Sequence, residues 1–163
     1  MNTRPPIDYI ERTREQYAAL GYPPYHWVTN PDTPPFTPLR KPLHESTVGL
    51  IASGGIYRHG QIAFHYKDDL SYREIPVSTP NSELRISHFA YDTRDAMLDP
   101  AVVFPLQTLR ELTSVSRIGA LARNAYTFMG GIYSSRKVAQ LLAPALAARL
   151  LKDEVDVAIL VPV

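Results

Sequence analysis

Two short and almost wholly apolar runs constrain the fold of this chain most strongly. They are Thr47–Ala52 (TVGLIA) and residues 155–161 (VDVAILV). Runs of this length and composition are typical of strands that are covered on both faces. Between them, an apolar stripe over residues 106–115 and an Ala- and Leu-rich stretch at 135–152 predict amphipathic helices, the second kinked at Pro144. This alternation predicts an α/β fold, with a mostly parallel open sheet and helices on both faces.

Proline marks a different region in front of this fold. Nine of the 15 prolines lie in residues 1–42. The spacing of apolar residues predicts one helix over 7–20, with Gly21 at its C-terminal cap. We therefore expect two parts: residues 1–44, a helix and a proline-rich wrapping segment, and residues 45–163, the α/β domain. A polyproline ligand for an aromatic groove is the alternative role for the front segment.

Composition excludes several classes of function. The 17 Lys and Arg residues nearly balance 16 Asp and Glu, so the net charge of +1 argues against nucleic-acid and membrane-surface partners. Neither a membrane-spanning run nor a signal peptide is evident, so we expect a cytoplasmic protein. The chain has no cysteine, which excludes a cysteine nucleophile or thiolate site within it. The five histidines lack metal-ligand spacing, so we expect no metal site.

Candidate chemistry lies where strands end, because sites in open α/β sheets form beyond the carboxyl ends of strands. This rule selects the turns at 53–55 and 129–131, the segment at 88–92 that follows an alternating strand at 84–89, and the position after Val163. His88 and Asp92 are the candidate catalytic residues, because a carboxylate can orient an imidazole that moves protons. A structural histidine is the alternative.

The same rule selects groups that would bind substrate. The amides of Gly54 and Gly55 are candidates for holding an anion, although a plain tight turn is equally consistent with the sequence. Arg85 is a candidate for a substrate carboxylate or for a structural acid such as Glu74. The acids of residues 67–69 are most simply a solvated loop. The candidate substrate-binding residues are Ser53, Gly54, Gly55, Arg85, Tyr91, Gly130 and Gly131.

A series of short motifs from residue 45 onward carries a resemblance to a known family. The motifs are SGGIY at 53–57, YREIP at 72–76, LRISH at 84–88, YDT at 91–93, VFPL at 103–106, LREL at 109–112, IGALA at 118–122 and DVAILVPV at 156–163. In this order, they resemble the glycine/sarcosine/betaine reductase component B and D-proline reductase selenoprotein family.

This resemblance implies a reductive function. In that family a selenocysteine, or a cysteine in its place, attacks a small amino-acid-like substrate and breaks a C–N bond, with electrons from dithiols. A pyruvoyl group on a partner subunit activates amine substrates. The resemblance places the selenocysteine or cysteine directly after Val163. We therefore expect the 45–163 domain to be truncated there, most simply by a selenocysteine codon taken as a stop; a trimmed sequence and a true short relative are the alternatives.

Other classes of function stay open at this point. As given, the chain has no redox nucleophile, and we expect it to be inactive alone. We expect partner reductase subunits, in a homo- or hetero-oligomer. A non-catalytic binding or assembly subunit, with the strand at 155–163 in its partner contacts, is the main alternative. A nucleotide-binding α/β domain has only the double glycine in its favour.

Overall fold

The computed structural model describes residues 8–163 and divides into two compact units after Pro35. In the first unit, helix α1 (Tyr9–Ala19) confirms the helix expected at 7–20. Gly21 has a φ of +69°, and the Tyr22 N–H donates to the Tyr17 carbonyl at 2.9 Å. This is the helix-ending geometry that glycine favours. The division predicted at residues 44 and 45, with its wrapping segment, stays a prediction.

Aromatic side chains hold the segment after α1 against the helix. The Tyr17 and Tyr25 rings lie 5.7 Å apart, and Tyr25 lies 4.7 Å from Trp27. Trp27 in turn packs at 6.0 Å from Tyr9, near the start of the helix. These edge-to-face pairs form a small cluster within the first unit.

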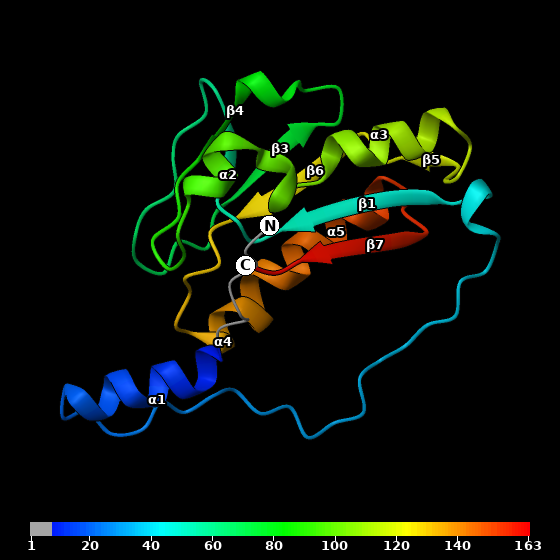
Figure 1. Ribbon diagram of the computed structural model, residues 1–163. Coiled ribbons are helices and arrows are strands. Elements are labelled where there is room, and N and C mark those ends of the chain that lie inside the picture. Colours follow the sequence, from blue (N-terminus) through cyan, green and yellow to red (C-terminus); the bar gives the residue numbers. More distant parts are fainter. Residues whose placement is uncertain (1–7) are drawn as a thin grey trace. The chain divides into compact units, whose positions relative to one another are not determined.

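The second unit is built on a five-stranded sheet with β1 (Thr47–Ala52) inside it (Figure 1). Strands β5 (Ala120–Leu121) and β6 (Asn124–Phe128) run parallel to β1 along one side, and β7 (Val157–Val161) runs parallel along the other. Strand β3 (Tyr72–Pro76) pairs antiparallel with β6. The mostly parallel sheet confirms the predicted fold class. Strands β3, β5 and β6 were not predicted.

Two predicted strands are shorter in the structure. Strand β7 begins at Val157; at Asp156 before it, the side chain accepts from the Thr47 N–H at 2.7 Å and the N–H donates to the Thr47 carbonyl at 2.9 Å. The strand expected at 84–89 is β4 (Leu84–Ile86), which pairs antiparallel with β2 (Ile56–Arg58) in a separate two-stranded sheet. After Ile86 the chain turns into the candidate site instead of extending.

Helices cover both faces of the five-stranded sheet. One face carries α2 (Arg94–Leu98) and α3 (Leu106–Ser114), and the other carries α5 (Ala143–Lys152). The irregularity expected at Pro144 is a π-helical turn just before it, η4 (Val138–Leu142). Among residues 8–163 there is no helix with the length and apolar character of a membrane span. The remaining short elements are α4 (Ser135–Lys137), η1 (Leu43–Glu45), η2 (Asn81–Glu83) and η3 (Pro100–Val102).

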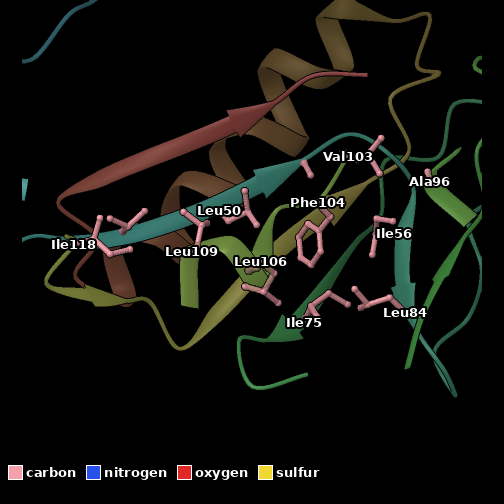
Figure 2. Packing of buried hydrophobic residues seen from close by; sticks show 13 residues of the cluster. Leu50, Ile56, Ile75, Leu84, Ala96, Val103, Phe104, Leu106, Leu109 and Ile118 are labelled. Carbon is pink, nitrogen blue, oxygen red and sulfur yellow. The ribbon is translucent and has the colours of Figure 1, made fainter. Parts of the chain in front are cut away.

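Alternate residues of β1 face the two cores. Val48 and Leu50 join the larger cluster with Leu106 of α3, whereas Ile51 packs with Leu146 of α5. This two-sided burial explains why the strand is apolar throughout. Figure 2 shows the larger cluster, in which the side chains of Ile56, Ile75, Leu84, Phe104 and Leu106 gather.

Candidate functional site

Three chain segments meet beyond the carboxyl ends of β1, β6 and β7. The Gly55 N–H donates to the Phe128 carbonyl at 3.0 Å, and the Gly130 N–H donates to the Ser53 carbonyl at 2.9 Å. The hydroxyl oxygen of Ser53 accepts a hydrogen bond from the Val163 N–H at 2.9 Å. Ser53 therefore joins the turn after β1 to the segments that follow β6 and β7.

Gly55 brings a fourth segment, residues 87–92, onto this turn. Its carbonyl accepts from the Ser87 N–H at 2.9 Å, and its φ is +69°. A Cβ at this position would lie 2.2 Å from the Ser87 carbonyl oxygen and 3.2 Å from the Cβ of His88. Both the backbone conformation and the close approach require glycine. Through this contact the structure brings the predicted 53–55 and 88–92 segments together.

His88 lies at the centre of the assembly and is only 8 % exposed. Its Nδ1 accepts a hydrogen bond from the Ala90 N–H at 3.1 Å. In the neutral imidazole the proton is therefore on Nε2, which is buried and bonded to none of residues 8–163. The ring packs 4.5 Å from the ring of Tyr91, whose hydroxyl donates to the Gly54 carbonyl at 3.0 Å. His88 thus presents a buried Nε2–H that meets no partner at full hydrogen-bond geometry, with the Ser53 backbone as its nearest polar neighbour.

Burial keeps both rings of this pair uncharged. It lowers the pKa of His88 below 6.5, and the Ser53 backbone opposes that shift. It also raises the pKa of Tyr91 above 10. In each case the charged form loses more solvation than the neutral form. At neutral pH the site therefore offers a neutral imidazole Nε2–H.

The expected pair of His88 and Asp92 does not form. The Asp92 carboxylate binds the Arg94 guanidinium, with both carboxylate oxygens 2.9 Å from Nε. This contact with Arg94 lowers the pKa of Asp92 to about 2. Asp92 is solvent-exposed at the start of α2, and the Nδ1 atom of His88 is already bonded to Ala90. A main-chain amide therefore orients the imidazole in place of the expected carboxylate, and catalysis by either residue stays a prediction.

The glycine amides are also used differently from the expectation. The Gly55 N–H is bonded to β6 and the Gly130 N–H to the turn after β1, while the Gly131 N–H donates to the Met129 sulfur at 3.1 Å. Within the described chain, the Gly54 N–H has no bonded partner. The expected anion contact from two amides is therefore reduced to Gly54.

Arg85 does not join the site. Its guanidinium folds back on its own chain and donates to the carbonyls of Ser82 at 2.8 Å and Leu84 at 2.7 Å. Glu74, the acid suggested for it, instead forms an ion pair with Arg149 at 3.1 Å. A role for Arg85 in carboxylate binding has no support from this geometry.

A contribution from residues 64–69 was missed in the sequence. The Ser87 hydroxyl donates to the Phe64 carbonyl at 3.2 Å, and Asp68 accepts from the Tyr133 N–H at 2.8 Å. Asp69 accepts from the His65 N–H at 2.7 Å. These acids therefore organise a loop that supports the site, although 67–69 was expected to be only solvated. Nothing local in the sequence signals the contacts of Ser87 with Phe64 and of Asp68 with Tyr133, which lie 23 and 65 positions apart.

The part of the chain that builds this site is similar to known proteins. Residues 25–163 match the model of the family described as glycine/sarcosine/betaine reductase selenoprotein B. The chain is 33% identical over 132 residues to D-proline reductase subunit gamma of Acetoanaerobium sticklandii. That alignment covers 80% of this chain and 54% of the relative, so the chain spans about half the length of the relative. No solved structure matches the chain.

Proposed function

Because the chain belongs to the glycine/sarcosine/betaine reductase selenoprotein B family, we propose that it is the component of a reductase that acts on a small amino-acid-like substrate. The proposed reaction breaks one C–N bond. A dithiol supplies two electrons and becomes a disulfide, and the carbon and nitrogen of the broken bond each gain one hydrogen. The similarity to D-proline reductase subunit gamma supports this class of reaction.

The nucleophile in this proposal is a selenocysteine or cysteine directly after Val163. Such a group supplies an ionised chalcogen, and a selenol is more fully ionised at neutral pH than a thiol with a pKa of about 8.5. The described residues fit this position, because the Ser53 hydroxyl holds the Val163 N–H beside the turn after β1. Where the substrate amine needs activation, we propose a pyruvoyl group on a partner subunit.

The buried Nε2–H of His88 is the observation that carries the proposed role of this chain. Its lowered pKa leaves little imidazolium at neutral pH, so we assign it hydrogen-bond donation to the substrate carboxylate in preference to proton transfer. The unpartnered Gly54 N–H lies in the same assembly and is the second donor. A carboxylate accepts two such hydrogen bonds at once, which would orient the C–N bond.

A kinetic comparison tests this role. The complete reductase, assembled from the full-length protein and its partner subunits, is assayed with D-proline and with glycine betaine, using a dithiol as reductant. We expect His88→Ala to raise KM about tenfold or more and to change kcat less, because it removes a substrate contact. His44→Ala, at an exposed histidine outside the site, should leave both constants unchanged. A fall in kcat with unchanged KM would instead assign His88 to proton transfer, and unchanged kinetics would remove it from the site.

The selenocysteine proposal has a separate test in the coding DNA. We expect a UGA codon after the Val163 codon, followed by an open reading frame that continues the family sequence. A different stop codon without a related frame beyond it would overturn the proposal for a selenocysteine.

A role in assembly is the second candidate, and strand β7 is the observation that favours it. Within the described chain β7 pairs only with β1, and Leu160 on it is 68 % exposed. An uncharged edge strand of this kind readily pairs with another chain. Thermal denaturation separates the two candidates. Stabilisation by glycine, betaine or proline supports substrate binding, whereas stabilisation only by a partner subunit supports assembly.

A further inference from the structure

A groove of about 500 Å³ lies at the other end of the sheet from the candidate site. It is formed where β3 ends and β6 begins, beside the last turn of α5. Its lining carries the three cations Arg123, Arg149 and Lys152 and the two carboxylates Glu74 and Asp153. Strand β6 connects the two places: Asn124 and Tyr126 line the groove, whereas Phe128 leads into the site at the carboxyl end.

Both carboxylates of the groove already have partners. Asp153 accepts a hydrogen bond from the buried Tyr126 hydroxyl at 2.8 Å. Glu74 forms an ion pair with Arg149 at 3.1 Å, and the Nε of Arg149 donates to the Tyr72 hydroxyl at 2.9 Å. The acidic groups are therefore committed to the wall of the groove, and they hold Arg149 in place.

The opposite wall is fixed from α3. Arg110 donates to the carbonyls of Val77 at 2.8 Å and Thr79 at 2.9 Å, which pins the turn that carries Ser78. The Val77 N–H donates to the Arg123 carbonyl at 3.2 Å. The backbones on this side of the groove are therefore held in place without any bound molecule.

Two cations remain without partners in this fixed frame. The side chains of Arg123 and Lys152 form no hydrogen bond or ion pair with residues 8–163, and neither do those of Ser78 and Asn124. The positive charges of Lys152 and Arg149 could be explained by their position in the last turn of α5, because cations there interact favourably with the helix dipole. It does not account for Arg123, which lies between β5 and β6. The groove therefore holds two cationic and two neutral side chains whose polar groups are free to contact a ligand.

We propose that this groove binds the phosphate group of a small molecule. A guanidinium matches two phosphate oxygens with two parallel N–H bonds, and an ammonium adds a compact charge. Arg123 and Lys152 would supply these contacts, with the Ser78 hydroxyl and the Asn124 amide as neutral donors. The two cations without acidic partners, Arg123 and Lys152, suit a doubly charged phosphate better than a singly charged carboxylate. This inference does not depend on the reductase proposal.

Calorimetric titration of the full-length protein tests the inference at low ionic strength in a buffer free of phosphate. The probes are inorganic phosphate, methyl phosphate and acetate. We expect saturable binding of one phosphate per chain and weaker binding of acetate. Methyl phosphate binding as tightly as inorganic phosphate identifies an ester as the ligand, and tighter inorganic phosphate identifies the free ion; either result supports a phosphate site.

Paired variants give the control. The double variant Arg123→Gln/Lys152→Gln should weaken phosphate binding about tenfold or more. Lys67→Gln/Arg117→Gln removes the same charge from exposed positions outside the groove and should leave the affinity unchanged. Thermal unfolding checks that both double variants fold. Asn124→Ala keeps every charge but removes one of the proposed neutral donors, so it should also weaken phosphate binding. Absence of saturable binding, equal weakening by both pairs, or equal affinity for acetate would overturn the proposal.

Discussion

The two ends of the sheet are built by opposite means, although β6 contributes to both. At its carboxyl end, the assembly around Ser53, Gly55 and His88 is buried, neutral and joined mainly through the main chain. At its amino end, the groove beside Arg123 and Lys152 is polar and built from long charged side chains. The first end depends on close approach, which a single added carbon disturbs. The second end depends on charged side chains, whose contacts water can partly replace.

The largest expected effect tests the close approach at the carboxyl end. Gly55→Ala combines a positive φ with a Cβ placed 2.2 Å from the Ser87 carbonyl oxygen. We expect it to lower the free energy of unfolding by more than about 3 kcal/mol, measured by urea denaturation. Gly60→Ala also has a positive φ but meets nothing within 4 Å, so it should cost only about 1–2 kcal/mol. Equal losses would show that the turn can relax and that close approach does not define this end.

A second pair of variants compares neighbouring residues of β6 that serve the two ends. The fully buried Thr127 hydroxyl donates to the Ile56 carbonyl, and the Tyr126 hydroxyl donates to the half-buried Asp153 carboxylate. Thr127→Val leaves a buried carbonyl without a partner and should cost about 1–3 kcal/mol. Tyr126→Phe should cost about 1 kcal/mol or less, because water can solvate Asp153. A larger loss for Tyr126→Phe in the same denaturation measurement would reverse the comparison.

The smallest expected effect is a pH dependence at His88. Its pKa in the folded protein is lowered below 6.5, so the unfolded chain binds a proton there more readily. The resulting stability is present above pH 6.5 and is lost as the pH falls through the lower pKa of the folded state. His88→Gln should therefore flatten the fall in the free energy of unfolding between pH 7 and pH 5. His44→Gln, at an exposed position, should not; if both variants give the same slope, His88 is not the group responsible.

Much of the fold could be predicted because its signals are local. The helical spacing before Gly21 and the apolar run Thr47–Ala52 identify α1 and β1 without any partner being known. Strand β6 was missed because Asn124–Phe128 mixes polar and aromatic residues, and its buried Thr127 is explained only by the Ile56 carbonyl. Strand β3 was also missed. Ile75 is its one buried residue, so the strand has no apolar run that the sequence could reveal.

The candidate site likewise has parts that the sequence predicts and parts that it does not. The rule that sites follow strands placed Ser53, Gly54, His88 and Tyr91 in one neighbourhood, and the structure brings them into contact. The predicted partner of His88 was wrong, because the direction of the turn after β4 sends Asp92 toward solvent. A spacing of four residues carries no information about that direction outside a regular helix or strand.

By itself, the amino-acid sequence determined the α/β alternation, the family resemblance and the strand ends at which the site forms. The alternation and the strand ends depend on composition and on periodicities that extend over a few residues, whereas the resemblance depends on short motifs in a fixed order. Only the tertiary structure decided which nitrogen of His88 carries the proton, which glycine amide is left unbonded, and that Arg123 and Lys152 line one groove. The reason is that these contacts depend on how the chain turns and on residues far apart in the sequence: the Ala90 N–H reaches His88 only through the turn after β4, Tyr91 reaches Gly54 across 37 positions, and Val163 reaches Ser53 across 110.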